Sequence, residues 1–148
     1  MDRALAVVEA DEATKDLVRE AGELAGGVGA ELVLVHVTGE DEYEERRSDL
    51  ESITELDVSY GIEKAKDGAA QFASDIGREV LSDVDVEWDA IGRVGMKGDT
   101  VLSTAESLDC DHVFIAGEKR SPAGKAVFGD VTQEVILEFD GAVTVVTV

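Results

Sequence analysis

Cysteine, histidine and long apolar runs are nearly missing from this sequence of 148 residues. A single cysteine, Cys110, excludes an intrachain disulfide, and two histidines cannot by themselves supply a zinc site. No apolar stretch reaches the roughly 18 residues that a membrane-spanning helix needs, and the first residues carry no cleavable signal pattern. We therefore expect a cytoplasmic protein, neither a secreted disulfide scaffold nor a membrane protein.

Basic residues are also scarce, with 13 Lys and Arg against 34 Asp and Glu, a formal charge of −21. A body of this charge repels a phosphate backbone, so we expect no nucleic-acid partner. Acid spread over the whole length keeps a protein hydrated in concentrated salt, where screening removes the mutual repulsion of carboxylates. We predict a halophile-type protein from a salt-loaded cytoplasm.

Proline occurs once, at Pro122, and aromatic residues make up only 5% of the chain. No interdomain linker and no internal repeat appears, and the hydrophobic fraction of 44% suffices for one aliphatic core. We therefore expect a single domain over residues 1–148.

Short β-branched runs alternate with segments of helical period. The runs predict strands at residues 5–8, 31–37, 84–88, 112–116 and 142–148. Helical spacing relates Leu17, Ala21, Leu24 and Ala25; Ala65, Ala69, Phe72, Ala73, Ile76 and Val80; Val101, Leu102 and Ala105; and Val131, Val135, Ile136 and Phe139. Because several strands are apolar on both sides, the pattern predicts an α/β fold: a doubly wound parallel sheet of five strands with helices on both faces, Rossmann-like.

Such sheets bind ligands outside the carboxyl ends of their strands. The residues at that edge should follow the predicted strands: 9–11, 37–39, 92–98, and Gly117 onward. A separate segment, residues 40–57, contains nine acids and only two bases, Arg46 and Arg47. We interpret it as a solvated loop or short helix.

The segment from Gly117 to Gly129 is basic in an otherwise acidic chain. It contains Lys119, Arg120 and Lys125 against one acid, Glu118, and lies between a predicted strand and a predicted helix. Glycines such as Gly124 let backbone amides approach a ligand, and the amides of the next helix point at its start. The segment therefore predicts an anion site, with phosphate as the obvious anion.

Two better-known phosphate motifs do not fit. Six residues separate Gly117 from Gly124 and Lys125, where a P-loop requires four, and Ala126 replaces the Ser or Thr that reaches magnesium. The glycines of residues 92–98 have the spacing GxxGxxG, which is not the dinucleotide motif. Arg93 and Lys97 in that segment either complement an anionic ligand or are simply solvated.

In these features the chain resembles the universal stress protein family over nearly its whole length. The resemblance rests on a first strand that ends in an acid and a small residue, a second strand that ends Val-His-Val, a long variable segment, and Asp-His-Val-Phe-Ile-Ala-Gly before the long loop. It implies the strand order 3-2-1-4-5. In ATP-binding members the loop has two glycines near its start and a third followed by Ser or Thr; Gly117 and Gly129 match the first and last.

The resemblance also implies roles for individual residues. Glu9 and Ala10 would flank an adenine, Val37 would line the base pocket, and Ala116 and Gly117 would lie on the ribose side. The phosphates would meet the residues Gly129, Asp130, Val131 and Thr132, with Lys119, Arg120, Ser121, Gly124 and Lys125 contributing from the loop.

Three residues depart from the family pattern: Glu9 replaces Asp, Arg120 replaces the second glycine, and Asp130 replaces Ser or Thr. Asp130, with Gln133 three residues later, is a good helix N-cap. Its carboxylate would occupy the amides that otherwise hold phosphate. At ~4 Å and an effective dielectric of 20 it would repel one unit of phosphate charge by about 4 kcal/mol, which penalises ATP more than ADP or AMP.

Other polar residues near the predicted edge have structural interpretations. We expect His36 to be a hydrogen-bonded strand histidine. Asp109, Cys110, Asp111 and His112 enter a strand and point alternately to opposite faces, so they cannot converge on one metal ion. Ser121 has no histidine within reach and is expected to bond a phosphate or the turn at Pro122.

The last predicted strand, from Ala142 to Val148, is apolar on both faces. In the implied strand order it lies at a sheet edge, where it invites pairing with a second copy. We therefore predict a two-fold homodimer through this strand.

Two functions remain open from the sequence. The first is a dimeric regulatory protein that binds an adenine nucleotide (ATP, ADP or AMP) or another small anion, with magnesium only alongside nucleotide. The alternative is a dimeric interaction or stress-protection module whose anion site Asp130 closes. We favour a protein that is not an enzyme, because no general base or metal ligand set can be named for ATP hydrolysis.

Overall fold

The computed structural model describes residues 1–41, 55–117 and 129–147, with the side chains of 55–60 left out of the description. Five parallel strands form one sheet in the order β3-β2-β1-β4-β5. The strands are β1 (Arg3–Val7), β2 (Glu31–Gly39), β3 (Trp88–Gly95), β4 (His112–Gly117) and β5 (Ala142–Thr147). This order and the Rossmann-like architecture confirm the prediction.

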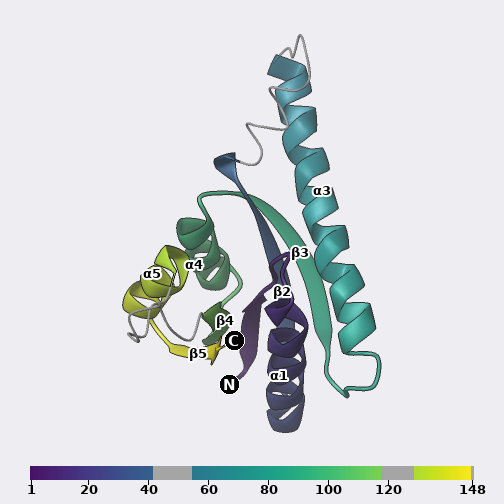
Figure 1. Cartoon of the computed structure of the whole chain (residues 1–148), viewed down its shortest axis with the longest axis vertical. Coiled ribbons are helices and arrows are strands. Elements are labelled where there is room, and N and C mark those ends of the chain that lie inside the picture. The colour runs from purple at the N-terminus through teal and green to yellow at the C-terminus, as the bar shows by residue number, and fades with distance from the viewer. Residues whose placement is uncertain (42–54, 118–128, 148) are drawn as a thin grey trace.

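Helices cover both faces of the sheet. They are α1 (Ala13–Val28), α3 (Glu55–Val80), α4 (Lys97–Ser107) and α5 (Asp130–Glu138). Helices α1 and α3 lie on one face, α4 and α5 on the other, and α3 extends well beyond the sheet (Figure 1). No helix within the described ranges is both long and apolar enough to cross a membrane.

Each face has its own apolar cluster. The α1 and α3 face buries Phe114 with Leu17 and Leu34, whereas the α4 and α5 face buries Val37 with Leu5 and Val101. Alternate residues of the central strands therefore serve both clusters, as the continuous apolar runs predicted.

One predicted strand has the wrong bounds, and one helix is longer than its predicted positions. The third strand, predicted at residues 84–88, is β3 and begins where that prediction ends, at Trp88. Val84 and Val86 instead pack, half-buried, against the apolar cluster on the α1 and α3 face. The glycines Gly92 and Gly95, expected in the loop after the strand, lie within β3. The second helix begins at Glu55, ten residues before the first predicted position, so the end of the acidic segment is helical; residues 42–54 lie outside the description.

Candidate functional site

The candidate site lies at the carboxyl ends of β1 and β4. Because β2 lies on one side of β1 and β4 on the other, the chain leaves these two neighbouring strands in opposite directions. This is the position at which open α/β sheets form a ligand crevice. The residues that follow β1 and β4 therefore decide what this edge can bind.

Side-chain hydrogen bonds fix the end of β1. His36 Nδ1 lies 2.7 Å from the Val8 carbonyl oxygen, and because a carbonyl only accepts, Nδ1 carries the proton. The His36 ring also contacts Phe72, with centroids 4.7 Å apart. The prediction of a hydrogen-bonded strand histidine is confirmed.

The turn after β1 is held by a second set of bonds. The Glu9 amide donates to Thr14 Oγ1 at 2.8 Å, and the Thr14 amide donates to Asp11 Oδ1 at 3.0 Å. Thr14 is buried, whereas Ala10 is exposed. The start of α1 therefore fixes the backbone of Glu9 and leaves its side chain at the edge.

Lys97 brings positive charge to this edge. Its Nζ lies 3.2 Å from Glu9 Oε2, and each side chain is 29% exposed. The pair joins the turn after β1 to the start of α4, two segments that are far apart in the sequence. Arg93 differs, because its Nη1 donates to the carbonyl of Gly92 in its own strand at 2.9 Å. Of the two bases left open by the sequence, Lys97 therefore contacts a predicted site residue.

The start of α5 is tied to the end of β4. Thr132 Oγ1 donates to the Ala116 carbonyl at 2.8 Å, and Thr132 is only 6% exposed. Gly117 is buried, and Val131 is half-buried against the apolar cluster on the α4 and α5 face. The side chain of Thr132, one of the predicted phosphate-side residues, therefore makes a structural hydrogen bond within the fold.

Asp130 is not the N-cap that the sequence predicted. Gly129 is the cap residue, with extended backbone and no side-chain capping bond, and its carbonyl accepts from the Gln133 amide at 3.0 Å. Asp130 is already the first helical residue, so its exposed carboxylate is not placed to accept from the amides that an N-cap side chain satisfies.

Val37 is fully buried among the α4 and α5 cluster, directly beside Arg93 in the sheet register. The remaining predicted residues, which are Lys119, Arg120, Ser121, Gly124 and Lys125, lie outside the described residues. The described site therefore consists of Glu9, Lys97 and the first turn of α5.

The segment Asp109 to His112 lies where β4 begins, at the end of the sheet opposite the candidate site. Its side chains have structural partners there. Asp111 Oδ2 accepts from the Asp2 amide at 2.8 Å, and His112 Nε2 lies 2.7 Å from Thr144 Oγ1. Burial raises the pKa of the Cys110 thiol to about 11, so the thiolate is scarce at neutral pH. Burial also lowers the pKa of His112.

The strand order and the helices on both faces define a Rossmann-like α/β protein. A family model described as the universal stress protein family matches residues 1–147. The chain belongs to this family. A comparison with curated proteins finds no significant match.

Solved structures share the fold. UspA from Lactobacillus plantarum is 18% identical, with a TM-score of 0.68 over 98% of this chain and 97% of that one. A universal stress protein in complex with cAMP is 14% identical, with a TM-score of 0.64 over 99% and 96%. One from Archaeoglobus fulgidus in complex with dAMP is 18% identical, with a TM-score of 0.57 over 98% and 96%.

Proposed function

We propose that this chain is a regulatory protein that binds an adenine nucleotide, such as AMP or ATP, at the carboxyl edge between β1 and β4. The observation that carries the proposal is that Glu9 and the start of α5 flank the point where the chain leaves these two strands in opposite directions. Its signal would be binding and not turnover. Magnesium would enter only with the nucleotide.

The two ends of the site suit the two ends of a nucleotide. The half-buried Glu9 carboxylate is an acceptor for the exocyclic amino group of adenine, with Lys97 holding it at the edge. At the other end, Gly129 caps α5 without a side-chain bond, and the amides at such a helix start suit an anion. Support also comes from the family relatives crystallised with cAMP and dAMP.

The negative charge of Asp130 disfavours nucleotide binding, and it determines which nucleotide binds more tightly. The repulsion of about 4 kcal/mol per phosphate charge holds for two charges ~4 Å apart at an effective dielectric of 20. Because Asp130 is exposed, water and salt weaken it, since screening at 1 M salt acts over roughly 3 Å. We therefore expect AMP to bind more tightly than ATP, with the difference largest at low salt.

Equilibrium binding of labelled AMP and ATP in molar KCl tests the proposal. Saturable binding by the unmodified chain, strengthened in Asp130→Ser and more so for ATP, is the expected result. Asp140→Ser is the matched control, because it removes an exposed acid just beyond the other end of α5. No binding by the unmodified chain, with binding gained in Asp130→Ser, would instead support the closed interaction module.

The second part of the proposal is a homodimer through β5. This strand is at the edge of the sheet, contains no ionisable side chain, and is only half-buried along residues 143–146. On α5, Ile136 and Leu137 remain 39% and 82% exposed. An uncharged edge is the surface at which copies of a −21 chain repel each other least.

A proline in β5 tests the dimer. The Ala142 amide donates to the Asp111 carbonyl, so alternation directs the Val145 amide outward. Val145→Pro removes that outward donor and should yield monomers in sedimentation velocity. Val145→Ala trims the side chain, keeps the donor and should remain dimeric. A monomeric unmodified chain would refute this part alone.

A further inference from the structure

Among the described residues, β3 is the other outermost strand of the sheet, and no strand pairs with its outer edge. The Leu32 amide donates to the Glu87 carbonyl at 2.9 Å, so the backbone groups of Glu87 face β2. Alternation along a parallel ladder then directs the amides and carbonyls of Ala90 and Gly92 away from the sheet. Such groups are a template for pairing with another strand.

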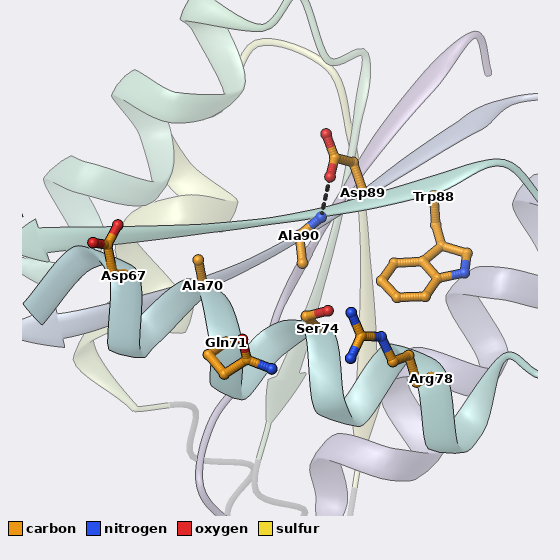
Figure 2. A pocket seen from close by; sticks show the side chains of 8 residues that line it. All are labelled: Asp67, Ala70, Gln71, Ser74, Arg78, Trp88, Asp89 and Ala90. Carbon is orange, nitrogen blue, oxygen red and sulfur yellow. Dashed lines mark hydrogen bonds between the residues drawn. The ribbon is translucent and has the colours of Figure 1, made fainter. Parts of the chain in front are cut away.

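Two side chains of the same strand occupy these outward groups. The Ala90 amide donates to Asp89 Oδ1 at 2.8 Å, a bond that Figure 2 shows at the edge of the strand. The Gly92 carbonyl accepts from Arg93 Nη1 at 2.9 Å. One donor and one acceptor needed by an incoming strand are therefore already bonded, each to a charged side chain.

Charged side chains also line the groove beside this edge. This groove of about 470 Å³ runs between α3 and β3, and Figure 2 shows Asp67 and Asp89 lining it together with Arg78 and Trp88. No ionisable side chain lies in β5, so the two edges of the sheet differ in both hydrogen bonding and charge.

We infer that Asp89 and Arg93 close the β3 edge against strand pairing, so that assembly is confined to the β5 edge and ends at a dimer. The second half of this inference rests on the proposed dimer. A two-fold dimer through β5 carries two β3 edges on its outside, and pairing there would extend the assembly without closing it. Closure of β3 is what prevents such growth.

The double variant Asp89→Ala/Arg93→Ala tests the closure in the full chain. Sedimentation velocity should give assemblies at least twice the mass of the unmodified protein at the same concentration. The matched control is Asp67→Ala/Arg78→Ala, which makes the same charge changes at two residues of the groove beside this edge. The control should keep the mass of the unmodified protein. An unchanged mass in the Asp89→Ala/Arg93→Ala variant would overturn the inference.

The same substitutions in the Val145→Pro background separate this inference from the proposed dimer. With the β5 edge blocked, opening β3 should convert monomers into dimers. If the unmodified chain is itself monomeric, the β5 dimer fails, yet association gained in the double variant still supports closure of β3.

Amide hydrogen exchange tests the closure without relying on assembly. In the unmodified protein the outward Ala90 amide should exchange at least about tenfold more slowly than in Asp89→Ala, because the carboxylate holds its hydrogen. Exchange at the same rate in both proteins would show that the amide is open, and would overturn the inference even if a variant folds poorly.

Discussion

Asp111 anchors the beginning of the chain. Its carboxylate accepts from the amides of Asp2 at 2.8 Å and Arg3 at 3.3 Å, and the first of these bonds is the main cause of its lowered pKa. A lowered folded-state pKa means that the carboxylate stabilises the fold above its ordinary titration range and loses this effect as pH falls through the folded-state value.

Asp111→Asn should therefore cost about 1 kcal/mol of unfolding free energy at pH 7, and less as the pH falls below 4. Urea denaturation of both proteins over this pH range measures the difference. Asp140→Asn, at another exposed acid, should show no comparable dependence. A cost that stays constant down to low pH would mean that the charge of Asp111 is not what the two amides recognise.

At the site, the sequence indicates positions along the chain but not side-chain contacts. Glu9 is expected at the ligand edge because it follows a predicted strand, whereas Thr132 is expected there only from the family resemblance. The sequence did not indicate the Glu9–Lys97 pair, because the two residues come together only through the order of strands and the start of α4. It also made Asp130 the cap, since a helix start shifted by one residue changes which backbone group a carboxylate can reach.

At the scale of elements, β3 is the strand whose position the sequence predicts wrongly. Val84 and Val86 alternate with acids as a half-buried strand does, whereas the true strand is rich in glycine. The cause is the close packing of α3: a Cβ on Gly92 would meet the Lys66 carbonyl and the Ala70 amide, and Gly77 of α3 leaves room for the Trp88 ring. The close packing of α3 on β3 outweighs the strand propensity of the individual residues, and no local sequence pattern indicates that packing.

Gly92→Ala should consequently destabilise the protein by roughly 1–3 kcal/mol, because the atoms in its way are backbone and cannot turn aside. Gly27→Ala is the control: a Cβ there meets nothing within 4 Å on an exposed turn of α1. It should be neutral or stabilise by up to about 1 kcal/mol. Urea denaturation of the two variants compares them, and equal midpoints would contradict tight packing of α3 on β3.

For the whole molecule, the alternating elements predicted the parallel α/β sheet and the family resemblance implied the strand order, and both are confirmed. The effect of the charge is a different matter, because −21 describes the chain without saying how acids and bases are distributed in space. The described ion pairs, such as Arg3–Glu31 and Lys15–Glu79, are largely exposed and so contribute little each. Repulsion among the unpaired acids should therefore outweigh attraction.

Salt should stabilise this protein for that reason. Raising KCl from about 0.1 M to 1 M shortens the screening length from roughly 10 Å to 3 Å and removes more repulsion than attraction. We expect the Tm to rise by roughly 5 °C, the shift that about 2 kcal/mol produces in a domain of this size. A variant with Gln at the exposed residues Glu20, Glu87, Glu106 and Glu138 has a formal charge of −17 after losing four acids from −21. It should melt higher at low salt and gain less from KCl. Equal gains in both proteins would mean that salt acts through something other than screening of these carboxylates.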